Sequence, residues 1–287
     1  MPFARYFNPF AIVTVVGNLI TFVNGEGLNM RITITRSLEP EPDTCELGIE
    51  GIDPVRARLM GRVFRETSAA QIVNVQLGYD AIPTNAFTGR LESFQDVVPR
   101  GQSTWTFALA GDGADAWDTD KLVPAKAALA PISTQIEGAM AVLGLVPSPT
   151  VAPVLAGGNP AAAGPFTESG VRTAADLLDT ACRTLRCRWW IRDGMLWLSR
   201  NGVPNPGPAI VLAPNVPGPR LPGTPLVEPV AYGGSGLIQC TTFLEPALVP
   251  GGQVVYEGGA FRVEHVVHSA ETRSAAPWVS RIIGRAL

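Results

Sequence analysis

Charged side chains are scarce in this chain. Asp, Glu, Lys and Arg make up only 16% of its 287 residues, whereas roughly 25% is usual. Lysine is nearly absent, with Lys121 and Lys126 as the whole set, and the net charge is −3. A protein that grips nucleic acid needs a dense basic face for the phosphates, so this composition argues against stable nucleic-acid binding. The low charge predicts either a large core or a surface that partner proteins cover.

Metal ligands are equally sparse. No Cys-x-x-Cys pair is present, and a zinc site needs about four ligands at tight spacing. His265 and His268 are the only histidines, and an offset of three on a strand places them on opposite faces. The run Asp112–Asp120 has four carboxylates but lacks the glycine and closing glutamate of a calcium loop. We therefore expect no metal, no cofactor and four buried thiols from synthesis in a reducing compartment: Cys45, Cys182, Cys187 and Cys240.

Catalytic signatures are missing as well. The sequence has no Gly-x-Ser-x-Gly elbow, no Walker loop and no dinucleotide-binding glycine fingerprint. The run Gly233–Gly236 is rich in glycine, but strand-like residues follow it instead of the helix that a phosphate cradle requires. None of the many carboxylates stands out as one half of a glycosidase pair. We therefore expect that the chain is not an enzyme and has no catalytic residue.

Long apolar runs are also absent. The segment Ala11–Val23 is apolar, but Gly17 and Asn18 interrupt it and it is too short to cross a bilayer. The first residues lack the charged-then-apolar order of a signal peptide. We expect strands in this segment and no stable membrane insertion.

The length and the changes in composition predict three domains, which we place at residues 1–118, 119–205 and 206–287. The first and the last are mainly β. Met30–Arg36 alternates apolar and polar residues as a half-buried strand does. Asp53 is a predicted cap for a helix from Val55 to about Arg65.

The middle domain is predicted to be a small α+β unit. Leu122–Gly144 is predicted to be helical, with either a kink or the start of a second helix at Pro131. Val146–Phe166 is predicted to be a linker, or a loop that becomes ordered against a partner. Thr173–Arg186 is amphipathic, and the strands beyond it flank Asp193-Gly194, a strong hairpin signal.

Two predicted hairpins resemble each other, although more than half of the chain separates them. An aromatic residue opens each first strand and a tryptophan opens each return strand, so we expect four buried aromatics: Phe87, Trp105, Phe261 and Trp278. Such self-similarity is typical of a repeated unit, and it predicts two similar β-domains. The alternative is chance, because any two hairpins share the same alternation.

The order of several segments resembles tailed-phage baseplate hub proteins, a group related to the late control protein D family and to the base of type VI secretion spikes. Arg31–Arg36 and Leu38–Ile52 resemble the opening of that family. Gln76–Tyr79, Phe87–Leu91 and Ala110–Gly113 resemble later landmarks of its first domain. Leu244–Gly251 and Phe261–Thr272 resemble its C-terminal segments, except that Ser269-Ala-Glu-Thr272 stands where Gly-Asp is usual.

The resemblance implies a homotrimer with two tube-type β-barrel domains per chain, related by duplication and arranged six around an axis. Such a ring joins a hexameric tail tube, or its initiator protein, to a trimeric spike within the virion baseplate, among other baseplate proteins, and DNA passes through without specific binding. Since rows of arginine would hold phosphates, we expect a neutral or acidic channel, with arginines facing carboxylates or neighbouring subunits. The residues expected at assembly interfaces are Phe3, Tyr6, Phe7, Arg31, Arg36 and Arg90.

Two other classes of function stay open. Related hubs sometimes carry a peptidoglycan hydrolase, which here requires a fused catalytic domain. A carbohydrate-binding tail-tip component is the second alternative, because Trp189, Trp190 and Trp197 lie on one predicted hairpin and could stack on sugars. Adjacent strand residues face opposite ways, however, so packing under the helix explains at least one of these tryptophans.

Overall fold

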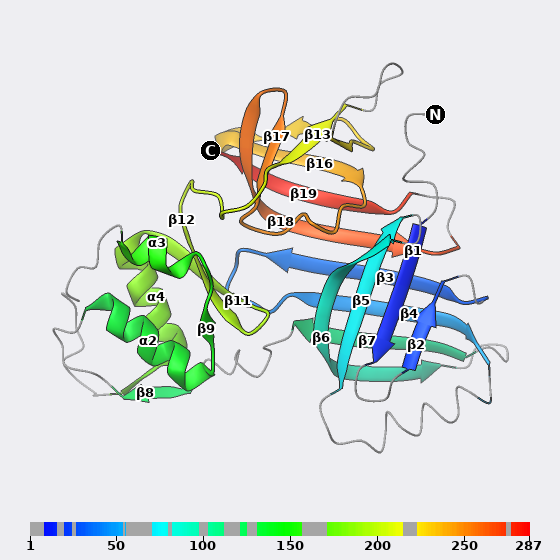
Figure 1. Ribbon diagram of the computed structural model, residues 1–287, viewed down its shortest axis with the longest axis horizontal. Helices are drawn as coiled ribbons and strands as arrows, with labels where there is room; N and C mark the ends of the chain where they lie inside the picture. The colour runs from blue at the N-terminus through cyan, green and yellow to red at the C-terminus, as the bar shows by residue number, and fades with distance from the viewer. Residues whose placement is uncertain are drawn as a thin grey trace.

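The computed structural model describes residues 9–15, 20–24, 27–53, 55, 71–79, 82–97, 103–111, 121–124, 131–156, 171–214, 223–273 and 277–287. They form a first β unit, a middle unit with the helices, and a second β unit (Figure 1). The mainly β class with an α+β middle is confirmed. Within the described part of the chain, no helix is long and apolar enough to cross a membrane.

The first β unit is an antiparallel sheet in the order β3-β4-β7-β6-β5-β1-β2. Apolar and polar residues alternate along its strands, so that in β3 Met30, Ile32 and Ile34 enter the core while Arg31 is exposed on the opposite face. Of the predicted helix after Asp53, only Val55 is described, and its N–H donates to the Asp53 carboxylate at 2.9 Å. The strands are β1 (Pro9–Val15), β2 (Ile20–Val23), β3 (Asn29–Ser37), β4 (Thr44–Ile52), β5 (Ile72–Tyr79), β6 (Ile82–Val97) and β7 (Ser103–Gly111).

The middle unit packs its helices on one face of a three-stranded sheet, β11-β12-β9, and also contains the β8–β10 pair. Its hairpin turn has positive φ at both Asp193 and Gly194, as the predicted two-residue turn requires. The elements are β8 (Leu122–Pro124), α2 (Ile132–Leu143), β9 (Val146–Pro147), α3 (Val151–Ala156), β10 (Val171–Thr173), α4 (Ala174–Leu185), β11 (Cys187–Arg192) and β12 (Met195–Arg200).

Two expectations for the middle unit need correction. Leu122–Pro124 is a strand, not helix, because it pairs with β10, and α2 begins only after Pro131, whose ring disfavours helix in the residue before it. The predicted linker is partly regular structure: β9 pairs with β12, and α3 buries Val151 and Val154. Residues 157–170 of that segment lie outside the described residues.

The second β unit is built around β18, which pairs with β17, β19 and β3. The β3–β18 pairing runs from Ser37–His265 to Arg31–Glu271, so one continuous sheet passes through both β units. The elements are β13 (Ile210–Ala213), β14 (Thr224–Pro225), β15 (Ala231–Tyr232), η5 (Gly234–Gly236), β16 (Leu237–Phe243), β17 (Gln253–Tyr256), β18 (Gly259–Glu271) and β19 (Val279–Ala286).

Both predicted hairpins are present, as β6–β7 and β18–β19, and their four aromatic residues are buried. The two tryptophans are placed differently. Trp105 lies within β7, whereas Trp278 precedes β19 and donates its indole N–H to the Glu271 carbonyl at 3.0 Å. Both pack into the core of the first β unit. The internal duplication therefore stays a prediction.

Candidate functional site at the junction of the three units

The β11–β12 hairpin presents two different faces. Trp189 packs under α4 and donates its indole N–H to the Asp179 carboxylate at 2.7 Å. Trp190 lies on the other face and stacks on Trp197, with ring centroids 6.0 Å apart. The opposite orientation of Trp189 and Trp190 was predicted, and their side chains are 5% and 1% exposed. Because sugar stacking requires an open ring face, these two tryptophans do not support the carbohydrate-binding alternative.

Arg192, on the same face as Trp190, reaches a carboxylate just before β4. Its Nε donates to Asp43 Oδ2 at 2.8 Å, and Arg36 Nε lies 3.3 Å from the same oxygen. Arg36 also donates to the Ala86 carbonyl. Burial lowers the pKa of Arg36, and the Asp43 carboxylate opposes this effect. We call this group, which joins the middle unit to the first β unit, the Asp43 clamp: Asp43, Arg36 and Arg192.

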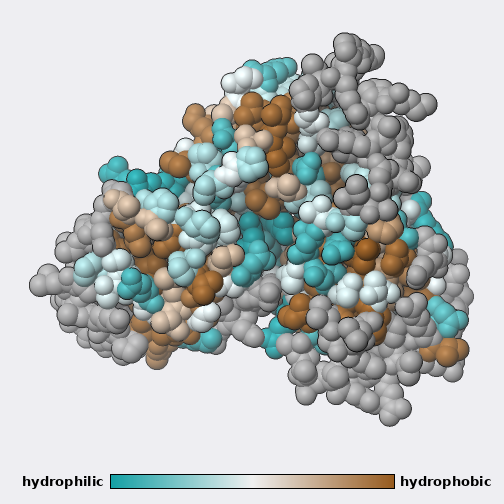
Figure 2. All heavy atoms as spheres, in the orientation of Figure 1, coloured by the Kyte–Doolittle hydropathy of each residue, from teal (hydrophilic) through white to brown (hydrophobic). Residues whose placement is uncertain are grey.

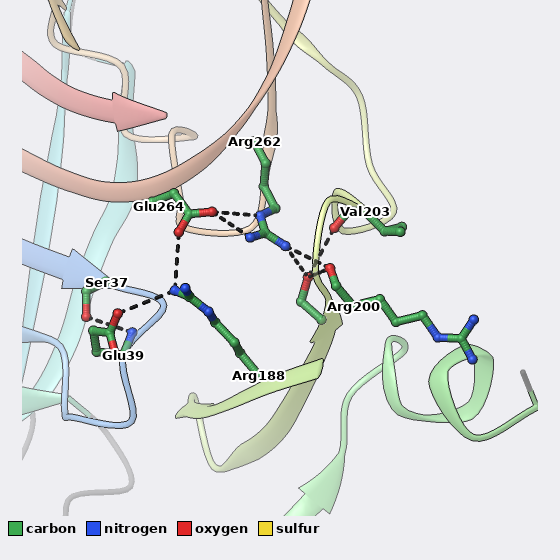
Figure 3. A network of polar contacts seen from close by, with 8 residues as sticks. Ser37, Glu39, Arg188, Arg200, Val203, Arg262 and Glu264 are labelled. Carbon is green, nitrogen blue, oxygen red and sulfur yellow. Dashed lines mark hydrogen bonds and ion pairs between the residues drawn. The ribbon is translucent and has the colours of Figure 1, made fainter. Parts of the chain in front are cut away.

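A second carboxylate, Glu264, connects all three units (Figure 3). Arg262 donates to Glu264 Oε1 from Nε at 3.1 Å and from Nη2 at 2.5 Å, and its Nη1 donates to the Arg200 carbonyl at 2.8 Å. Arg188 donates to Glu264 Oε2 at 3.2 Å and to Glu39 Oε1 at 3.4 Å. The β-bulge between Val263 and His265 places Glu264 here. We call this group the Glu264 clamp: Glu39, Arg188, Arg262 and Glu264.

Hydrophilic residues gather on the surface where the middle unit meets the β sheet, as Figure 2 shows. Both clamps pair guanidinium groups with carboxylates, and Arg192 contacts both oxygens of Asp43, which fixes the orientation of the two groups. Among the described residues, no group of three or more His, Cys, Asp or Glu is placed to hold a metal. The arrangement is therefore suited to joining parts of the chain.

A buried histidine forms a third polar group. His268 Nε2 donates to the Leu248 carbonyl at 3.2 Å, so Nδ1, 2.8 Å from Ser280 Oγ, is the acceptor of that hydroxyl. Ser280 Oγ in turn accepts from the Glu245 N–H at 3.0 Å. Burial lowers the pKa of His268 to about 3, and the Arg36 charge adds to the shift. The neutral ring thus fastens the loop after β16 to β18, which joins the two C-terminal segments of the predicted resemblance.

The predicted site residues lie in different places. Arg31 is exposed and pairs with Glu271 at 3.0 Å, and the hydrogen bond to that carboxylate raises its pKa. Arg36 is buried inside the chain, which makes it unavailable to another subunit in this conformation. Arg90 is half-buried on β6. The remaining predicted residues and the Asp112–Asp120 run lie outside the described residues: Phe3, Tyr6 and Phe7.

His265 and His268 face opposite sides of β18, as predicted, and His265 is half-buried. All four cysteines are buried free thiols, also as predicted. Burial raises the pKa of the Cys240 thiol to about 12, which makes it a poor nucleophile. Sequence reasoning missed the roles of Asp43, Glu264 and His268, because their partners are distant along the chain.

The comparisons with known proteins add a shared fold. No protein-family model and no curated protein matches the sequence. A tail protein from Neisseria meningitidis MC58 superposes with a TM-score of 0.61 at 10% identity, covering 97% of both chains. The 43 kDa tail protein of prophage MuSo2 from Shewanella oneidensis gives 0.57 at 13% identity, covering 96% of this chain and 98% of that one.

A third structure is an E. coli component of the type VI secretion system, described as similar to the T4 bacteriophage tail proteins gp27 and gp5. It gives a TM-score of 0.54 at 10% identity and covers 96% of this chain and 76% of its own. At these identities the likeness establishes a common fold.

Proposed function

We propose that this chain is a structural component of a bacteriophage tail, and within the tail the baseplate hub. The observation that supports this most is the extent of the structural likeness, since two tail proteins, one of them from a prophage, match along nearly their whole length. The match spans all three units, because the aligned part covers at least 96% of this chain.

The finer part of the proposal is a homotrimeric ring with pseudo-six-fold symmetry. In it, each chain contributes its two β units, and the ring joins the hexameric tail tube to a trimeric spike. Two observations support it: the two β units share one continuous sheet through β3 and β18, and the chain shares its fold with a secretion component likened to tail proteins gp27 and gp5. The proposed partners are tube or tube-initiator protein, spike and other baseplate proteins, while DNA passes transiently.

We propose no catalysis for the chain. Its most buried charged side chains are committed to one another, with Asp43 binding two arginines and Glu264 binding two more. Such groups hold a shape and leave no free nucleophile or base there. In this proposal the function resides in the interfaces of the assembled ring.

The mass of the purified chain in solution tests the proposal. A homotrimer of 30.4 kDa chains has three times that mass, about 91 kDa, and negative-stain images should show rings with a central hole. A monomer at all concentrations, with no ring after addition of tail tube protein, would contradict the hub. Lysis of cell-wall material by the isolated chain would contradict the proposed absence of catalysis.

A further inference from the structure

The middle unit has a hydrophobic core of its own. Its buried apolar cluster is drawn only from Val123 to Leu198. The clusters of the two β units contain residues before Thr119 or after Asn205. Among the described residues, no buried cluster joins the middle unit to either β unit, and the unit forms a separate lobe in Figure 1.

The junction is instead built from charged groups. Asp43, Arg192 and Arg262 are 7%, 9% and 2% exposed, so two buried carboxylate-centred clamps hold the lobe. Arg188 and Glu39 are the accessible part of the junction, with 39% and 64% of their side chains exposed. Trp190 is buried on the same hairpin face, and its indole N–H has no hydrogen-bond partner among the described residues.

We propose that the middle unit is a latched arm, which the Asp43 and Glu264 clamps hold against the sheet and which leaves it as a folded body when a clamp loses its carboxylate. A buried guanidinium without its carboxylate is strongly unfavourable. Undocking returns Arg36, Arg192 or Arg262 to water and leaves the apolar clusters of the middle unit and of the β units intact. Unfolding would expose those clusters to water. Undocking of the arm therefore costs less free energy than unfolding, and it is the expected response to an unpaired guanidinium.

The segment between the arm and β13 gives the arm room to move. Val203 is 51% exposed, but its N–H donates to the Arg200 carbonyl and its carbonyl accepts from Ser199 Oγ, each at 3.1 Å, so it is held by the arm. The Asn205 N–H donates to the Gly251 carbonyl of the second β unit at 2.7 Å. Gly251 has a φ of +85°, and a Cβ there would lie 2.2 Å from Asn205 Nδ2, so this contact is close. The hydrogen bonds of Asn201 and Val203 are made to the arm and that of Asn205 to the second β unit, so the chain can change direction between Val203 and Asn205 without breaking them.

The experiment uses the full chain with Asp43→Asn and Glu264→Gln, and Glu46→Gln as the matched control. Glu46 is an exposed carboxylate on β4 that forms no ion pair among the described residues. Thermolysin cleavage near Val203 should become at least tenfold faster in the two clamp variants, with a larger radius of gyration by X-ray scattering and an unchanged far-ultraviolet circular dichroism spectrum. The control should stay within twofold of the wild type.

A triple variant separates release from misfolding. Asp43→Leu combined with Arg36→Met and Arg192→Met removes the charges together, and apolar groups of similar volume can replace a buried ion pair without loss. This variant should cleave within twofold of the wild type. Unchanged cleavage in Asp43→Asn, or loss of circular dichroism in step with faster cleavage, would overturn the proposal, as would a triple variant that cleaves like Asp43→Asn.

Discussion

At the scale of single residues, the sequence predicts well which face of a strand a side chain lies on. It predicts poorly which distant residues that side chain contacts. The offset of three between His265 and His268 correctly predicts opposite faces of a strand. It could not predict that His268 meets Leu248 and Ser280, because turns and strand pairing bring these residues together. Asp43 and Arg192 likewise lie 149 positions apart. Alternation is a local property, whereas the clamps depend on the assembled fold.

His268 should make the protein sensitive to acid. Its folded pKa of about 3 lies below the ordinary value of 6.5, so the unfolded chain takes up a proton first as the pH falls. The stability due to the neutral ring is complete above pH 6.5 and is lost as the pH approaches 3, by roughly 2–4 kcal/mol between pH 7 and pH 4. Urea unfolding should show a gap between wild type and His268→Gln that is largest at pH 7 and narrows toward pH 4. A constant gap would show that the imidazole does not titrate as described.

The tryptophans of the two similar hairpins, Trp105 and Trp278, should be major contributors to stability. Trp105 and Trp278 are 0% and 3% exposed in the core of the first β unit. Truncation of either to alanine should lower the free energy of unfolding by about 3–5 kcal/mol, measured in a denaturant melt. Tyr232→Ala is the control, since Tyr232 is 63% exposed and its loss should be close to neutral. Near-neutral tryptophan variants would contradict the packing.

At the scale of elements, local chemistry predicted the hairpin turn, the amphipathic helix α4 and the strand at Met30–Arg36. Thr173 caps α4 by accepting the Asp176 N–H at 3.1 Å, and the amphipathic pattern of the helix buries Leu177, Leu178 and Cys182. The strand at Leu122–Pro124 was missed because pairing with β10 determines its conformation. The same holds for β9, which exists only beside β12. Short segments follow their neighbours in space more than their own propensities.

Gly194 should be needed for its backbone conformation alone. It has a φ of +67°, and a Cβ there would meet nothing within 4 Å. Gly194→Ala should therefore lower the free energy of unfolding by about 1 kcal/mol through backbone strain. Gly138→Ala within α2 is the comparison, because its Cβ would make ordinary contact with Val123 at 3.5 Å and alanine favours helix by about 0.5–1 kcal/mol. Equal effects of the two substitutions in thermal unfolding would contradict this assignment.

At the scale of the whole molecule, the sheet that runs through both β units was not predictable. The sequence indicates two β regions with a helical unit between them, and the structure places them so. Edge-to-edge joining through β3 and β18 depends on which strand edges remain free, and no residue pattern specifies that. The arginine expectation is partly confirmed, since Arg31 and Arg36 pair with carboxylates.

Arg281 and Arg285 should lie at contacts between subunits. Both are exposed on one face of β19, and neither has a carboxylate partner among the described residues. Substituting both with glutamate should weaken the proposed trimer at least tenfold in sedimentation equilibrium, because a neighbouring carboxylate would then be repelled. The control is Arg186→Glu at the exposed end of α4, which should leave the trimer unchanged. An unchanged trimer in the double variant would remove these residues from the interface.

An electron cryomicroscopy reconstruction of the assembled chain tests the central claim most directly. The account predicts a three-fold ring in which six β units surround an open channel, with Arg281 and Arg285 directed at neighbouring subunits. A single chain, a closed or asymmetric assembly, or a ring whose channel is lined by these unpaired arginines would contradict it.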